Sequence, residues 1–140
     1  MVQRIAIPVC LFLLVCMALS AAPAGAQEPG APVPAAELIS GEPHSMPIAG
    51  MITMVDIGAH SCIPCKMMTP IIEELSTEYE GRAAIAFIDV WKHRAEASKY
   101  GVTTIPTQIF YDTQGKERYR HVGYLDKQSI VAKLAELGVE

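Results

Sequence analysis

The sequence predicts a three-layer α/β domain with a mixed central sheet of about four strands. Two apolar strand patterns, at 51–57 and 83–90, are each followed by a helical pattern, and such strand-helix units favour parallel strands. Two more strand patterns, at 107–111 and 118–122, flank a turn signal at 112–115, which predicts an antiparallel hairpin. A last amphipathic helix completes the order βαβαββα.

Residues 1–26 have the pattern of a secretory signal peptide. A basic start precedes the apolar segment 5–19, and the small residues Ala24 and Ala26 suit a cleavage site. We therefore expect a mature chain that begins near Gln27 and is periplasmic or secreted. A retained membrane anchor is the alternative, although the apolar segment is shorter than the roughly 20 residues that span a bilayer.

Removal of this segment leaves ten basic and fifteen acidic residues, a net charge of −5. This charge does not indicate a nucleic-acid or anionic-membrane surface, and we expect no nucleic-acid partner. Cys10 and Cys16 leave with the segment, so thiol chemistry in the mature chain belongs to Cys62 and Cys65. A disulfide between cysteines with only two residues between them in the sequence closes a loop too small to be the main stabilising cross-link of a domain. The pair therefore calls for a chemical role.

The ordered domain is predicted over 51–140. Five prolines among Ala and Gly favour an extended linker over 27–50, in which only residues 35–40 suit a short helix. The strand at 51–57 is apolar on both alternating faces, as a central strand covered on both sides should be. The domain is therefore expected to begin near Met51.

The helices follow from apolar spacing and from end signals. The spacing predicts an amphipathic helix over 64–80, which Pro70 kinks and Gly81 ends. A shorter helix is predicted over 92–100. Gly101 is expected to end this shorter helix. The last helix is expected to have Asp126 as its N-cap, a hydrophobic staple between Leu125 and Ile130, and its end at Gly138.

The motif Cys62-Ile63-Pro64-Cys65 lies where the first strand passes into the amphipathic helix. Cys62 falls at the helix N-cap and Cys65 one turn further on, so the two sulfurs can bridge. The unpaired N–H groups and the macrodipole of a helix N-terminus favour Cys62 as a thiolate. Pro64 costs little there, because N–H groups of the first turn lack helical partners.

From about Met51 to Gly138 the chain resembles the thioredoxin family. The motifs that carry the resemblance are Val55-Asp56, Cys62-Ile63-Pro64-Cys65-Lys66, Pro70, Lys99-Tyr100-Gly101-Val102, Ile105-Pro106-Thr107 and Gly123. The resemblance implies a thioredoxin-like fold whose opening strand and helix are shortened or absent here. It also implies a buried Asp56 that exchanges a proton with Cys65, and a cis bond before Pro106 that presents Ile105 to an extended substrate. We count Ile63 and Pro64 with this substrate-binding region.

The sequence departs from the family pattern beside the motif. Ser61 and Gly58 replace aromatic residues, Ile63 replaces a glycine, and Phe87 occupies the position of a lysine near the buried aspartate. These departures leave the reaction type intact and bear on redox potential and partner. His60 is either a tuner of the Cys62 thiol or an exposed side chain.

We expect a thiol:disulfide oxidoreductase that acts on protein disulfides and needs no cofactor beyond the Cys62/Cys65 couple. The proline before Cys65 resembles the reducing members, which favours a periplasmic reductase. Such a reductase needs electrons from a membrane thiol carrier, and we expect it to be a monomer. The alternatives are a metallochaperone that holds copper through both cysteines and a histidine, and a redox-regulated binding module. No metal site is assigned, since zinc usually takes four ligands and no second CxxC exists.

Overall fold

A computed structural model of the chain describes residues 33–140. The predicted signal peptide over 1–26, its cleavage near Ala26 and the beginning of the predicted linker lie outside the described residues. None of the helices within 33–140 combines the length and the apolar character that a membrane crossing requires.

The sheet has four strands in the order β2-β1-β3-β4. The strands are β1 (Thr53–Gly58), β2 (Ala84–Asp89), β3 (Thr107–Tyr111) and β4 (Glu117–Val122). β1 pairs in parallel with β2 and antiparallel with β3, and β3 pairs antiparallel with β4. The mixed sheet and the hairpin that the sequence predicts are therefore confirmed.

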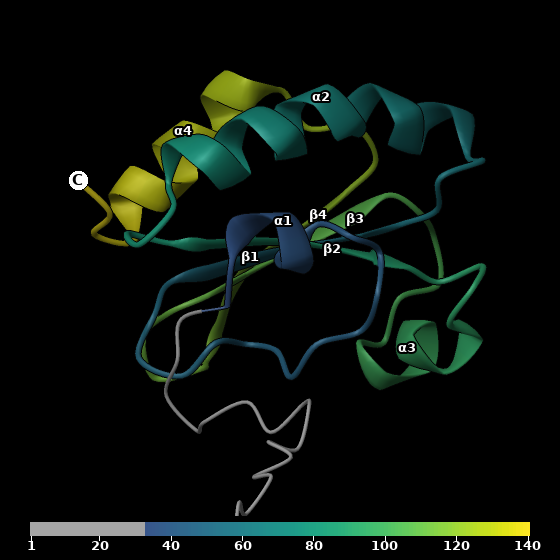
Figure 1. Cartoon of the computed structure of the whole chain (residues 1–140), viewed down its shortest axis with the longest axis horizontal. Coiled ribbons are helices and arrows are strands. Elements are labelled where there is room, and N and C mark those ends of the chain that lie inside the picture. Colours follow the sequence, from purple (N-terminus) through teal and green to yellow (C-terminus); the bar gives the residue numbers. More distant parts are fainter. Residues whose placement is uncertain (1–32) are drawn as a thin grey trace, which may run out of the picture. The chain divides into compact units, whose positions relative to one another are not determined.

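Helices lie on both faces of this sheet, as Figure 1 shows for α2 and α4 on one side and α3 on the other. The helices are α1 (Ala35–Leu38), α2 (Ile63–Glu78), α3 (Arg94–Lys99) and α4 (Lys127–Glu136). Pro70 lies inside α2 without ending it. α3 begins two residues later than predicted, because the backbone of His93 is not helical. The three-layer arrangement is confirmed.

The last helix begins as its sequence predicts. Asp126 is the N-cap of α4, and its side chain accepts a hydrogen bond from the Ser129 N–H. Leu125 and Ile130 are both buried in the same apolar cluster, where a hydrophobic staple places them. Burial of both side chains in one cluster agrees with the predicted staple.

Strand alternation divides the core into two layers and decides which side chains meet α2. Met54 of β1 packs in the cluster shared with α2 and α4, whereas Val55 and Ile57 belong to the cluster on the α3 side. Because side chains alternate along a strand, Asp56 shares the face of Met54. Asp56 is therefore directed toward the helix that carries the cysteines.

The described part of the proline-rich segment, 33–50, packs against the sheet, whereas the sequence favoured an extended linker there. Leu38 is 5% exposed, and the Asp89 N–H donates a 3.0 Å hydrogen bond to the Gly41 carbonyl. Gly41 also forms a single parallel bridge with Ile88 of β2. β2 is an edge strand of the sheet, and an edge strand carries unpaired backbone groups. The segment covers part of this edge, and its apolar side chains between the prolines favour this packing over an extended linker. The four-residue α1 and this bridge form the short opening of the fold.

Candidate active site

The two cysteines lie at the start of α2, where the sequence places them. Cys62 is the helix N-cap with an extended backbone, and Cys65 lies in the first turn. The two residues form a disulfide with a Cα–Cα distance of 5.2 Å. The Lys66 N–H donates a 3.0 Å hydrogen bond to the Cys62 carbonyl, which closes the first turn around the bridge. The pair is thus built for reversible oxidation on a rigid helix end.

The two cysteines differ in exposure. Cys62 is 8% exposed and Cys65 is 2% exposed, and both belong to a small apolar cluster with Ala59. A helix N-terminus stabilises a negative charge through its free N–H groups, and Cys62 is the closer of the two to that end. The geometry therefore favours Cys62 as the thiol that meets a substrate and Cys65 as the one behind it.

The loop before β3 forms the other side of this cluster. Ile105 is partly buried and packs against the cysteine cluster. The Ile105–Pro106 peptide bond is cis, as is the Met46–Pro47 bond elsewhere. The Pro106 carbonyl accepts a 2.8 Å hydrogen bond from the Gly123 N–H, which holds this loop against the end of β4.

Asp56 is a buried carboxyl on the face of the sheet beneath α2. It is 1% exposed, and its Oδ1 accepts a 2.7 Å hydrogen bond from Gln108 Nε2. Its Oδ2 has no hydrogen-bond partner within the described part of the chain. Burial raises the pKa of Asp56 to about 7, although the hydrogen bond from Gln108 opposes the rise. Such a group gains and loses a proton near neutral pH.

Asp56 lies on the face of β1 that α2 covers, two residues before Gly58, the position that lies against Cys65. A Cβ atom on Gly58 would lie 3.4 Å from Cys65 Sγ, and Gly58 shares a strand face with Asp56. On the helix side, Thr69 is one turn beyond Cys65 and lines a pocket together with Asp56. The Asp56 carboxyl and the Cys65 sulfur therefore lie in the same interface between β1 and α2.

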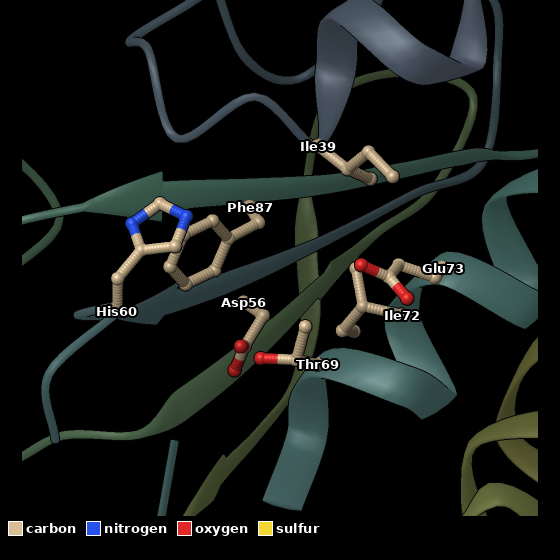
Figure 2. A pocket seen from close by; sticks show the side chains of 7 residues that line it. All are labelled: Ile39, Asp56, His60, Thr69, Ile72, Glu73 and Phe87. Atoms are coloured by element: carbon tan, nitrogen blue, oxygen red, sulfur yellow. The ribbon is translucent and has the colours of Figure 1, made fainter. Parts of the chain in front are cut away.

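This pocket connects the buried carboxyl with exposed side chains. Figure 2 shows the Asp56 carboxyl and the Thr69 hydroxyl reaching into it, with Glu73 and His60 at its borders. Its lining residues are Ile39, Asp56, His60, Thr69, Ile72, Glu73 and Phe87. Thr69, Glu73 and His60 are exposed, so the pocket lies between the buried Asp56 carboxyl and the protein surface.

His60 is held by an aspartate that the sequence analysis did not single out. His60 Nδ1 lies 2.6 Å from Asp89 Oδ2, which also accepts a 3.1 Å hydrogen bond from the His60 N–H. Asp89 Oδ1 accepts from the N–H groups of Trp91 and Lys92. The sequence feature that could have identified Asp89 is its position at the carboxyl end of a buried strand, where functional side chains of α/β domains gather. Likewise, Gln108 is a long polar side chain directly before the apolar residues Ile109 and Phe110.

The structure also bears on metal binding. Within residues 33–140, no group of three or more His, Cys, Asp or Glu side chains is placed to hold a metal ion.

Comparison with known proteins gives consistent matches over this domain. The family model described as Thioredoxin matches residues 45–136. The chain is 38% identical over 95 residues to the thioredoxin of Chlamydia caviae, which covers 68% of this chain and 91% of that protein. It is 41% identical over 85 residues to thioredoxin 2 of Chlorobaculum tepidum, and the match covers 61% of this chain and 77% of that protein. A thioredoxin of Staphylococcus aureus is 39% identical over 83 residues, and the match covers 59% of this chain and 79% of that protein.

Proposed function

Because the chain belongs to the thioredoxin family, we propose that it reduces disulfides of exported proteins through a Cys62/Cys65 dithiol-disulfide cycle. The chain is a disulfide oxidoreductase, and its redox centre is the cysteine pair itself. The observation that carries the proposal is the placement of this pair at the N-terminus of a helix that covers a buried carboxyl on the sheet. We propose the direction of the reaction, the compartment in which it takes place and the roles of the individual residues.

The reaction begins with the reduced pair. The Cys62 thiolate attacks one sulfur of a substrate disulfide, forming a mixed disulfide and releasing the other substrate sulfur as a thiolate. The Cys65 thiolate then attacks Cys62 Sγ, which breaks the mixed disulfide and releases the second substrate thiolate. Two electrons pass to the substrate, and the Cys62–Cys65 disulfide remains.

Asp56 acts in the second step. A buried thiol stays protonated, so Cys65 must lose its proton before it attacks. The ionised carboxylate of Asp56 accepts this proton, because a pKa of about 7 makes Asp56 a base matched to neutral pH. The pocket that reaches Thr69 and Glu73 lets the proton leave to water.

The substrate docks around the exposed edge of the cysteine pair. Ile63 is 78% exposed beside Cys62, and Pro64 is also exposed. Ile105 and Pro106 form the opposite border, where an extended segment can pair with the backbone beside Cys62. The exposed side chains of Ile63 and Pro64 offer apolar contact with little specificity, which suits varied protein substrates, whereas the buried Pro106 contributes by shaping the backbone at Ile105.

Direction and compartment rest on the sequence. The proline before Cys65 resembles reducing members of the family, and the segment 1–26 has the features of an export signal. A periplasmic or secreted reductase needs a source of electrons, for which we propose a membrane thiol carrier. We propose further that the protein works as a monomer.

Covalent trapping tests the roles of the cysteines. Reduced Cys65→Ser, incubated with insulin or with periplasmic proteins, should accumulate mixed disulfides through Cys62, since the resolving thiol is absent. The matched variant Cys62→Ser should trap few. A reversed trapping pattern, or full insulin reduction by both variants, would contradict the assignment. The midpoint potential of the couple tests direction: a value near the roughly −270 mV of thioredoxin supports a reductase, and one near −120 mV contradicts it.

A further inference from the structure

Gln108 carries a fully buried amide on β3. It is 0% exposed, and its neighbours on β3 include the fully buried Ile109 and Phe110. Burying an amide without hydrogen bonds costs free energy, so a side chain of this type needs a partner. The β1–β3 register places Gln108 directly opposite Asp56, and the bond between their side chains is 2.7 Å long.

The pair leaves one atom on each side unsatisfied. Gln108 Oε1 and Asp56 Oδ2 are both buried without a hydrogen-bond partner among residues 33–140. A glutamine amide carries a donor and an acceptor, and rotation about its last torsion exchanges them. Gln108 can therefore donate Nε2–H to the carboxylate, or accept the O–H of the protonated acid at Oε1.

We propose that Gln108 is a positioning residue for proton transfer, whose amide holds the Asp56 carboxyl beside Cys65 both before and after Asp56 takes the proton. This inference rests on the proposed role of Asp56. No proton passes through the amide: the proton moves from Cys65 Sγ to Asp56, and Gln108 changes only the group that it presents.

The other groups around Asp56 do not supply this bond. Cys65 and Glu73 come from α2, His60 from the loop after β1, and the uncharged Phe87 from β2. The pocket lining includes no lysine or arginine within the described range, and His60 is bonded to Asp89. The Gln108 N–H is thus the side-chain donor that stabilises the Asp56 carboxylate.

Gln108→Met tests the proposal, because methionine keeps the length of the side chain and lacks the amide. The first readout is the titration of the Asp56 carboxyl by carbon NMR in the oxidised protein, where the cysteines do not titrate. We expect the midpoint to rise by about one pH unit, since a bond that favours the charged form is lost. Ile109→Val, a mild change on the opposite face of β3, should leave the midpoint unchanged.

The second readout is the rate of the resolving step between pH 5 and 9. Gln108→Met should slow it about tenfold at pH 6 and much less at pH 9, which a merely structural change would not do. In the Asp56→Asn background, the same substitution should have no further effect on the pH profile. If Gln108→Met does not fold, Gln108→Leu provides the same measurements.

An unchanged or lower Asp56 midpoint in the folded variant would overturn the proposal, and so would equal slowing at every pH. Failure of the proposed function has a different signature. If Asp56→Asn resolves mixed disulfides at the wild-type rate, Asp56 is not the base, whatever Gln108 does to its titration.

Discussion

Asp56 and Phe87 stand opposite each other on the parallel strands β1 and β2, and both line the pocket beneath α2. The aromatic ring of Phe87 packs edge-on against His60, with 4.9 Å between ring centres. The carboxyl therefore has an apolar neighbour where a cation would stabilise its charge. This arrangement explains why burial is the largest influence on its pKa.

Phe87→Lys should lower the pKa of Asp56, because an ammonium group that reaches the pocket favours the carboxylate. An opposite charge nearby typically lowers a carboxyl pKa by about 1 to 3 units, so the acid limb of the pH-rate profile should move down accordingly. The profile of disulfide exchange between pH 5 and 9 checks this. Phe87→Leu is the control, and an equal change in both variants would mean that packing rather than charge is responsible.

Asp56→Asn should increase the free energy of unfolding at pH 8. The pKa of Asp56 is about 7 in the folded chain, above its ordinary value of 3.8, so the folded state holds the proton more tightly. The native state therefore loses stability as pH rises between these values. At about 1.4 kcal/mol per pKa unit, the penalty has an upper limit of about 4 kcal/mol.

Urea unfolding of both proteins at pH 8 and pH 4 measures this effect. The gain should be largest at pH 8 and should almost vanish at pH 4, where Asp56 is protonated in the folded chain. A gain of the same size at both values would show that the buried charge is not its cause.

Asp89→Ala should destabilise the domain by about 2 to 3 kcal/mol, because it removes the acceptor of three part-buried backbone N–H groups, those of His60, Trp91 and Lys92. Although burial opposes it, hydrogen bonds from His60, Lys92 and Trp91 hold the pKa of Asp89 at about 2. A depressed carboxyl pKa stabilises the folded state above the ordinary value of 3.8, and this stabilisation is lost as pH falls through 2. Urea unfolding at pH 7 checks the loss.

The control for Asp89 is His60→Ala, which removes the half-exposed ring and keeps the backbone N–H bond to Asp89. It should cost less than Asp89→Ala. A larger cost for His60→Ala would show that the ring, and not the backbone N–H groups, gives Asp89 its structural value.

In the reduced protein, Cys62 should alkylate before Cys65 at mildly acidic pH. Cys62 is the more exposed residue and lies at the helix N-cap, which favours its thiolate. Mass spectrometry after brief treatment with iodoacetamide at pH 6 identifies the modified residue. Cys65→Ser should react at the wild-type rate and Cys62→Ser more slowly; equal rates would refute the difference between the two thiols.

Local sequence was enough to place the reactive thiols. A strand pattern that passes into an amphipathic helix puts Cys62 at the N-cap and Cys65 one turn on, and the structure confirms this. Asp126 as a helix cap was predictable for the same reason. Each of these features depends on residues within one or two turns of each other, whose geometry the backbone sets.

The partners of the buried carboxyl depended on contacts that no local pattern contains. Gln108 lies 52 residues from Asp56, and their side chains meet because of the antiparallel β1–β3 register. Asp89 is 29 residues from His60, and the fold brings them together at the carboxyl ends of two parallel strands. A shift of one residue in either register would turn the side chains to the other face of the sheet. Residue type and spacing therefore predicted the reaction, whereas strand pairing set the surroundings of the buried carboxyl that we propose as its base.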